Sequence, residues 1–172
     1  MSLDVLVVGG GSIGERHLRC FQQEGAGRVA ICETLEERRT NIEQTYGVDG
    51  YGSIARACED YWDLVVIATP AATHGKLVER ALRAGKHVFV EKPLCLDIAE
   101  AESLKNLADD KGLVLMVGHL LLYHPGFQAL FKLTKNGNLG TLRYIYSNRL
   151  SLGKIRREEN ALWSFAPHDV SM

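Results

Sequence analysis

Three glycines near the start of the chain have a spacing at which the backbone can close around phosphate groups. Gly9, Gly11 and Gly14 follow an apolar run over residues 5–8 and precede a segment with helical periodicity. In such a turn the first glycine permits a tight bend, the second admits a pyrophosphate without a Cβ in the way, and the third lets helix and strand pack closely. The N–H groups that begin the helix then face the phosphates. We therefore expect a dinucleotide to contact Gly9, Gly11, Ser12, Ile13 and Gly14.

An acidic residue at the end of the next expected strand indicates which dinucleotide binds. Glu33 lies about 20 residues beyond the glycines, where a carboxylate accepts hydrogen bonds from both ribose hydroxyls and repels a 2′-phosphate. This predicts NAD, with NADP less favoured. Arg38 and Arg39 follow Glu33 and weaken the preference for NAD over NADP if the second helix places them near the ribose. A FAD site shares the glycine pattern, so the identity of the dinucleotide depends on the remaining motifs.

Apolar runs alternate with helix-like segments over the first 120 residues. Strands are expected over residues 5–8, 28–32, 64–68, 87–90 and 113–117, and helices over 15–23, 35–46, 72–84 and 98–110. Thr34 is the expected cap of the second helix, Gly85 ends the third, and Asp97 with Glu100 begins the fourth. This alternation predicts an α/β fold in which residues 1–120 form a Rossmann-like, doubly wound parallel sheet.

The pattern changes after residue 120. Residues 125–135 predict a helix that ends at Asn136-Gly137, residues 141–150 alternate as a strand with one wetter face, and a further helix is expected to begin near His168. We interpret residues 121–172 as the incomplete start of an α+β substrate domain. Because one strand cannot make a sheet, we expect the chain to be a truncated piece of a protein roughly twice as long.

Composition narrows the class of ligand. The 172 residues are 46% hydrophobic and 24% charged with a formal net charge of −1, which is typical of a globular protein and lacks the basic excess of a nucleic-acid binder. No apolar stretch approaches the roughly 18 residues of a membrane helix. The cysteines have no C-x-x-C spacing and no secretory leader precedes them, so we expect reduced thiols in the cytoplasm. No His, Cys and carboxylate group has zinc-ligand spacing, so no metal site is predicted.

Further motifs resemble one family. The segments Ala68-Thr69-Pro70-Ala71-Ala72-Thr73-His74, Val90-Glu91-Lys92-Pro93-Leu94, Gly118-His119 and Pro167-His168-Asp169 occur in the order and spacing of the glucose-fructose oxidoreductase, inositol dehydrogenase and MocA family of NAD(P)-dependent dehydrogenases. The resemblance covers essentially the whole chain. It implies a Rossmann domain followed by a largely antiparallel sheet domain, a substrate bound between them, and a full-length protein that is a homo-oligomer.

The resemblance also implies roles for individual residues. Thr69, Pro70 and His74 fall where the family contacts the nicotinamide half of the cofactor, and Glu91 belongs to the same site. Lys92 falls near the nicotinamide and the substrate hydroxyl, where a cation favours the alkoxide that develops as hydride leaves.

His168 matches the histidine that works with that lysine as acid or base. Ser164 stands where the family often has Asp, and Ala71 where it usually has Asn. Whether catalysis uses the Lys92 and His168 pair or Lys92 alone is therefore left open. His119 and His124 are equally compatible with a substrate cleft and with structural roles.

The substrate predicted from the resemblance is a sugar, a polyol or a nucleotide sugar. A locally basic and aromatic stretch suits an anionic substrate and equally suits a solvated loop; it consists of Arg149, Lys154, Arg156 and Arg157, with Tyr144, Tyr146 and Trp163 nearby. The same region resembles the branch that oxidises the 3-hydroxyl of nucleotide-linked amino sugars. We therefore predict an NAD-dependent oxidoreductase that transfers hydride to or from such a hydroxyl or ketone. The alternatives are a non-catalytic NAD-binding regulatory protein of the same fold and an NAD-assisted glycoside hydrolase.

Overall fold

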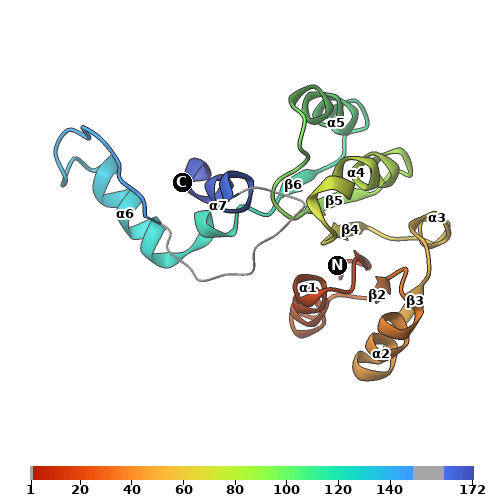
Figure 1. The fold of residues 1–172 in the computed structure, drawn as a ribbon. Helices are drawn as coiled ribbons and strands as arrows, with labels where there is room; N and C mark the ends of the chain where they lie inside the picture. The colour runs from red at the N-terminus through yellow and green to blue at the C-terminus, as the bar shows by residue number, and fades with distance from the viewer. Residues whose placement is uncertain (1, 149–160) are drawn as a thin grey trace. The chain divides into compact units, whose positions relative to one another are not determined.

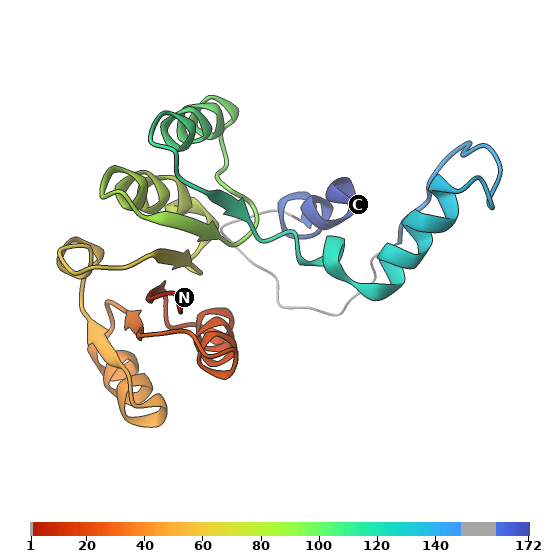
Figure 2. The same ribbon diagram turned by 180° about the vertical axis from the view of Figure 1, so that it is seen from behind.

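The computed structural model describes residues 2–148 and 161–172 and divides into two compact units, Met1–Gly118 and His119–Met172. A six-stranded parallel sheet in the order β3-β2-β1-β4-β5-β6 forms the first unit (Figures 1 and 2). Its strands are β1 (Val5–Val8), β2 (Val29–Cys32), β3 (Asp49–Tyr51), β4 (Leu64–Ile67), β5 (His87–Val90) and β6 (Leu115–Val117). The prediction of a doubly wound parallel sheet is confirmed.

Helices cover both faces of this sheet (Figure 1). They are α1 (Ser12–Gln23), α2 (Glu36–Tyr46), α3 (Ile54–Ala57), α4 (His74–Arg83) and α5 (Ile98–Asp110), with a 3-10 turn η1 (Ala71–Thr73) before α4. Alternate residues of β1 point to opposite faces: Val5 and Val7 pack with the buried residues of α1 and α2, whereas Leu6 and Val8 pack with those of α3, α4 and α5. Because both faces are covered, the central strands are continuously apolar.

Helix ends follow the local chemistry of the sequence, with one exception. Asp97 caps α5 by accepting a hydrogen bond from the Glu100 N–H at 2.8 Å, and Gly85 follows α4 with φ of 74°, as predicted. The prediction that Thr34 caps α2 is wrong. Leu35 is the N-cap residue, and its apolar side chain has no acceptor to offer the helix. Thr34 Oγ1 instead donates to Glu33 Oε1 at 3.3 Å, and the same oxygen accepts the Leu35 N–H at 2.9 Å.

Two short elements between α2 and β4 were not predicted. The edge strand β3 contains one apolar residue, Tyr51, so it lacks the apolar run that marks the other strands. The single turn α3 is capped by Ser53 and supports Trp62, which is 1% exposed and donates from Nε1 to the Ala57 carbonyl at 2.7 Å.

The second unit contains η2 (Leu120–Tyr123), α6 (Pro125–Lys135) and α7 (Ala161–Ser171). The predicted α6 is confirmed at both ends. The predicted strand over 141–150 is wrong for residues 141–148, which form no strand, and its last two residues lie outside the described part of the chain. The helix expected to begin near His168 begins at Ala161, so His168 lies inside α7. Arg149, Lys154, Arg156 and Arg157 also lie outside the described residues.

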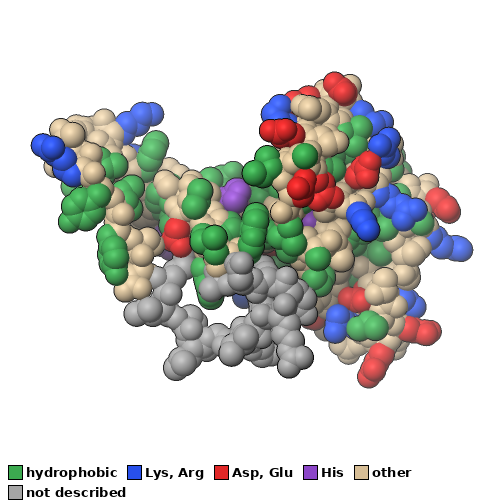
Figure 3. Space-filling model, turned by 45° about the horizontal axis from the view of Figure 1, so that its top comes forward, with side chains coloured by type: hydrophobic (Ala, Val, Ile, Leu, Met, Phe, Trp, Pro, Cys, Tyr) green, Lys and Arg blue, Asp and Glu red, His purple; other side chains and the backbone are tan. Residues whose placement is uncertain are grey.

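Hydrophobic side chains are distributed unequally between the units. Among the described residues, every buried hydrophobic side chain lies between Val5 and Ala108. Figure 3 shows hydrophobic side chains gathered on the surface of α6, where Leu130 and Phe131 are 53% and 48% exposed. No helix among residues 2–148 and 161–172 is long and apolar enough to cross a membrane.

Candidate dinucleotide site

The predicted binding residues of the first unit follow the carboxyl ends of four parallel strands. The glycine loop follows β1, Glu33 follows β2, Thr69 follows β4 and Glu91 follows β5. From β1 the chain adds β2 and β3 on one side of the sheet and then β4, β5 and β6 on the other. The direction in which strands are added therefore reverses next to β1, where the glycine loop lies. In open α/β sheets this reversal is where ligands bind, outside the carboxyl ends of the strands.

The three glycines are required for three different reasons. Gly9 has φ of +100°, and a Cβ on it would lie 2.7 Å from the Ala68 carbonyl oxygen at the end of β4. A Cβ on Gly14 would lie 1.8 Å from the Gly9 carbonyl oxygen, so only glycine allows α1 to pack this closely on the loop. A Cβ on Gly11 would meet nothing within 4 Å, which leaves open space beside the backbone. That space fits the role predicted for the second glycine, the approach of a pyrophosphate.

The beginning of α1 faces the same space with backbone donors. Gly11 is the N-cap residue and makes no side-chain cap, and the first intrahelical hydrogen bond joins Glu15 N–H to the Gly11 carbonyl at 2.9 Å. The N–H groups of Ser12, Ile13 and Gly14 precede that bond and, as in any helix, have no partner within their own helix. They can therefore donate to phosphate oxygens, with the helix dipole favouring negative charge.

Glu33 connects the glycine loop to the start of α2. Its Oε2 accepts the Gly10 N–H at 2.8 Å and lies 3.4 Å from Arg38 Nη1, and its side chain is 7% exposed. Burial opposes ionisation, but the Leu35 and Gly10 N–H donors and Arg38 together hold the pKa of Glu33 below its ordinary value. A buried carboxylate at this position fits two ribose hydroxyls better than a phosphate.

The loop after β4 is organised by hydroxyl and imidazole contacts. Thr73 Oγ1 lies 2.7 Å from the Pro70 carbonyl oxygen and 2.8 Å from Thr69 Oγ1. His74 is 1% exposed, and its two ring nitrogens contact the carbonyl oxygens of Pro93 and Thr69. Three residues here were predicted to contact the cofactor. Thr69 and Pro70 belong to the loop itself, whereas the His74 ring is buried against the Thr69 carbonyl.

The turn after β5 carries the Glu91-Lys92-Pro93 motif. Glu91 Oε1 lies 2.7 Å from His17 Nε2 of α1, and the two side chains are 16% and 15% exposed. Burial raises the pKa of Glu91, but the hydrogen bond and charge of His17, together with the backbone N–H and charge of Lys92, lower it, and the net shift is downward. The His17 ring also meets Phe89 edge-on, with ring centroids 5.2 Å apart. The pair therefore links the helix behind the glycine loop to the residue before Lys92.

His17 is the residue of this site that the sequence analysis missed. Its position three residues after Gly14, on the helix that the glycines open, was the available signal. Lys92 belongs to the first unit, and His168, which is half-buried in α7, belongs to the second. The cooperation of Lys92 with His168 therefore stays a prediction, as do the two readings of His119 and His124.

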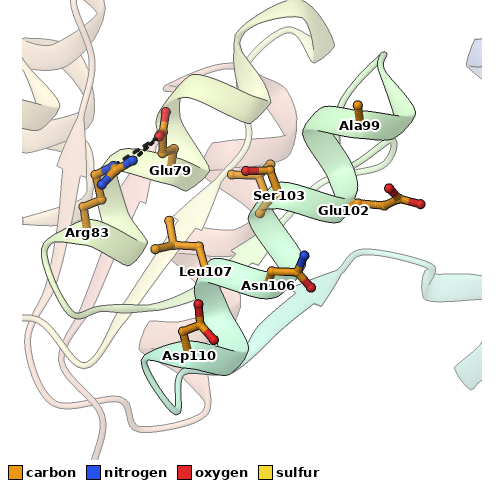
Figure 4. A pocket seen from close by; sticks show the side chains of 9 residues that line it. Glu79, Arg83, Ala99, Glu102, Ser103, Asn106, Leu107 and Asp110 are labelled. Carbon is orange, nitrogen blue, oxygen red and sulfur yellow. Dashed lines mark hydrogen bonds and ion pairs between the residues drawn. The ribbon is translucent and has the colours of Figure 1, made fainter.

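A separate groove of about 450 Å³ lies between α4 and α5 (Figure 4). It is lined by polar and charged side chains on both helices, including Glu79, Arg83, Glu102, Asn106 and Asp110. Glu79 and Arg83 pair with each other at 2.8 Å. All its lining residues lie on the two helices, and it does not include the strand ends that carry the glycine loop and Lys92.

A parallel sheet with a glycine loop at its reversal point, an acid after β2 and a helix N-terminus facing open space defines a dinucleotide-binding domain. A model of the oxidoreductase family with an NAD-binding Rossmann fold matches residues 3–119. The chain belongs to this family, which confirms the resemblance carried by the motifs.

Relatives and solved structures extend the comparison. UDP-N-acetylglucosamine 3-dehydrogenase of Acidithiobacillus ferrooxidans is 35% identical over 167 residues, which are 94% of this chain and 52% of that protein. Inositol 2-dehydrogenase of Rhizobium meliloti is 31% identical over 140 residues, 81% of this chain and 42% of that protein. The crystal structure of the WlbA dehydrogenase from Bordetella pertussis with NADH and UDP-GlcNAcA has a TM-score of 0.77 and 26% identity over 81% of this chain and 43% of that chain. The chain thus spans about half the length of these proteins.

Proposed function

We propose that this chain provides the NAD-binding part of an oxidoreductase that interconverts a hydroxyl and a ketone on a sugar, a polyol or a nucleotide sugar. The observation that carries the proposal is the Glu91-Lys92-Pro93 turn, at the same sheet edge as the glycine loop and linked to α1 through the 2.7 Å contact of Glu91 with His17. The names of the relatives support a sugar-type substrate, and a 3-dehydrogenase of a nucleotide sugar is among them.

The residues of the site take distinct roles in this proposal. Bound NAD supplies the hydride acceptor, and its reduced form the donor. The backbone N–H groups of Ser12, Ile13 and Gly14 donate hydrogen bonds to the pyrophosphate, and the Glu33 carboxylate accepts hydrogen bonds from the ribose hydroxyls. Lys92 Nζ donates a hydrogen bond to the substrate hydroxyl oxygen and stabilises negative charge on it as hydride leaves. His168 completes the proton path as acid or base in the protein as a whole.

The cofactor preference and the setting of the protein belong to the same proposal. The ionised Glu33 supports NAD over NADP. The four cysteines are free thiols and Cys32 and Cys95 are buried, which supports a cytoplasmic location. We further propose that the full-length protein is a homo-oligomer and that neither a nucleic acid nor a membrane is its partner. The net charge of −1 supports the exclusion of a nucleic acid.

Lys92→Ala tests the proposed role of the lysine. We expect turnover of sugar, polyol or nucleotide-sugar substrates to fall at least about a hundredfold, the order of a general acid–base contribution, while NAD affinity stays within a few-fold. The measurements are NADH formation by absorbance and NAD binding by calorimetry. Lys76→Ala, on the exposed side of α4, is the matched control.

Other outcomes of this experiment identify other functions. Loss of NAD binding in Lys92→Ala would assign the lysine to the cofactor. NAD binding without turnover of any substrate, together with a protein partner whose affinity depends on NAD, would contradict the proposal and favour a regulatory protein. Substrate cleavage without net NADH release would favour the NAD-assisted hydrolase.

A further inference from the structure

A histidine of α1 holds the carboxylate that directly follows β5. His17 Nε2 lies 2.7 Å from Glu91 Oε1, and the two side chains are 15% and 16% exposed. Because the pKa of Glu91 lies below its ordinary value, this side chain is ionised at neutral pH and can only accept hydrogen bonds. The His17 ring therefore donates from Nε2. A neutral ring with its hydrogen on Nε2 makes this bond, so the contact requires no charge on the histidine.

The Glu91 carboxylate is enclosed between α1 and the end of β6. A Cβ on Gly118 would lie 3.4 Å from Glu91 Oε2 and 3.1 Å from Phe89 Cζ, so the second carboxylate oxygen lies over a residue without a side chain. Phe89 precedes Glu91 by two residues on the same face of the strand, and its ring meets the His17 ring edge-on. The Glu91 N–H donates to the Ile67 carbonyl of β4 at 2.9 Å. These contacts fix both the backbone and the side chain of Glu91.

The same carboxylate also holds the backbone of the next residue. The Lys92 N–H donates a hydrogen bond to it, and this bond is among the contacts that lower the pKa of Glu91. Because the carboxylate is itself held by His17, the Lys92 N–H has an acceptor in a fixed place. We infer that His17 and Glu91 form a positioning pair, in which the ring holds the carboxylate, the carboxylate holds the Lys92 N–H, and the lysine is thereby fixed relative to α1.

The location of His17 on α1 connects the pair to the cofactor. The helix begins at Ser12, where its N–H groups face the space assigned to the pyrophosphate, and His17 lies just over one turn farther along. The pair therefore ties Lys92 to the element that holds the phosphates. His17 and Glu91 act through Lys92 as positioning residues. This consequence for catalysis rests on the proposed function, whereas the hydrogen bonds of the turn do not.

Hydrogen exchange of the Lys92 amide, followed by NMR of the ¹⁵N-labelled protein without ligand, tests the pair directly. His17→Phe keeps a ring against Phe89 and loses the donor, whereas His17→Gln keeps an N–H donor at a similar reach. The readout is the Lys92 exchange rate divided by the mean rate of the β1 amides, which separates local loosening from a general loss of stability. We expect this ratio to rise at least about tenfold in His17→Phe and to stay within about threefold in His17→Gln. An unchanged ratio in His17→Phe would overturn the inference.

A second side-chain anchor of α1 provides the matched control. The Tyr46 hydroxyl of α2 donates to Glu15 Oε2 at 3.0 Å, so Tyr46→Phe also removes one hydrogen bond from α1 and keeps the ring. We expect the exchange ratio to stay within about twofold in this variant. If His17→Phe does not fold, Glu91→Ala removes the acceptor instead and should raise the ratio at least about tenfold. A ratio that stays at the unaltered value in Glu91→Ala would equally overturn the inference.

Turnover tests what the pair does for catalysis. At saturating NAD we expect His17→Phe to lower kcat at least about tenfold, with NAD affinity within a few-fold, and His17→Gln to restore kcat to within about threefold. A normal kcat in His17→Phe, or a loss confined to NAD affinity, would contradict the effect on Lys92. If the unaltered protein binds no NAD or turns over no substrate, the proposed function fails, and the exchange of the Lys92 amide alone decides on the pair.

Discussion

At the scale of single residues, the glycine loop separates packing from binding. Gly14 is needed by the fold itself, since its Cβ would lie 1.8 Å from the Gly9 carbonyl oxygen, whereas the space beside Gly11 is open. We expect Gly14→Ala to lower the free energy of unfolding by about 3 kcal/mol, and Gly11→Ala to change it by about 0.5 kcal/mol or less. Urea denaturation measures both.

The binding measurements should show the opposite pattern for Gly11. Its extra methyl group enters the space assigned to the pyrophosphate, so we expect NAD affinity to fall at least about tenfold while the fold is retained. Calorimetric titration with NAD checks this. If the Gly11→Ala protein binds NAD as tightly as the unaltered protein, the pyrophosphate does not bind beside Gly11.

Glu91 makes stability depend on pH in a predictable direction. Its pKa in the folded protein is below the ordinary 4.5, because burial, which raises it, is outweighed by the hydrogen bond and charge of His17 together with the backbone N–H and charge of Lys92. The ionised form therefore stabilises the fold above about pH 4.5, and this contribution is lost as the pH falls through the lowered pKa. We expect the difference in unfolding free energy between the unaltered protein and Glu91→Gln to shrink on acidification from neutral pH.

The control for this titration is Glu79→Gln. Glu79 pairs with Arg83 on the surface of α4, and its side chain is 47% exposed, so its substitution should have a small effect at every pH. A difference for Glu91→Gln that is the same at neutral and acidic pH would show that the Glu91 carboxylate carries no charge-dependent stabilisation.

Which residues of the site could be predicted depends on how local their signals are. The glycines, Glu33 and Lys92 follow strands at fixed offsets, so pattern and resemblance located them. The His17 contact joins residues 74 positions apart, and the His74 ring reaches a carbonyl 19 positions away. No periodicity records such contacts, because they depend on how β1, β4 and β5 lie in the sheet.

At the scale of elements, the cap of α5 provides a clear test of local stability. Asp97 accepts the Glu100 N–H at 2.8 Å, and this bond satisfies a donor that the helix itself cannot. Asp97→Ala should lower the free energy of unfolding by about 1 kcal/mol, and Asp97→Asn, which keeps an acceptor, should recover most of it. Chemical denaturation compares the three proteins. Equal losses in both variants would attribute the effect to charge.

Elements with strong internal signals were predicted well. β1, β5, α5 and α6 begin and end where the apolar runs, the Asp97 cap and the glycine at 137 place them. β3 escaped prediction because an edge strand with one apolar residue has no distinctive pattern. The strand predicted over 141–150 failed within 141–148, because alternation alone makes no strand and no described residue offers this segment a neighbouring strand with which to form hydrogen bonds.

At the scale of the whole molecule, the buried core and the sheet belong to one unit. Every buried hydrophobic side chain among the described residues lies within 5–108. At the β6 edge of the sheet, the Gly118 N–H donates a hydrogen bond to the Val90 carbonyl at 2.8 Å. A chain that ends at Gly118 therefore keeps the sheet, both covered faces and the glycine loop. We expect such a protein to fold, to melt within a few degrees of the 172-residue chain and to bind NAD within a few-fold.

The matched control is a chain that ends at Gly112. It lacks β6, and so loses the pairing of Val88, Phe89 and Val90 with Leu115, Met116 and Val117 and exposes the edge of β5 just before Glu91. We expect it to melt well below the chain that ends at Gly118 and to bind NAD more weakly. Thermal melting by circular dichroism and NAD titration measure both. If the chain ending at Gly118 behaves like the shorter one, residues 119–172 stabilise the dinucleotide domain and the two units fold as one.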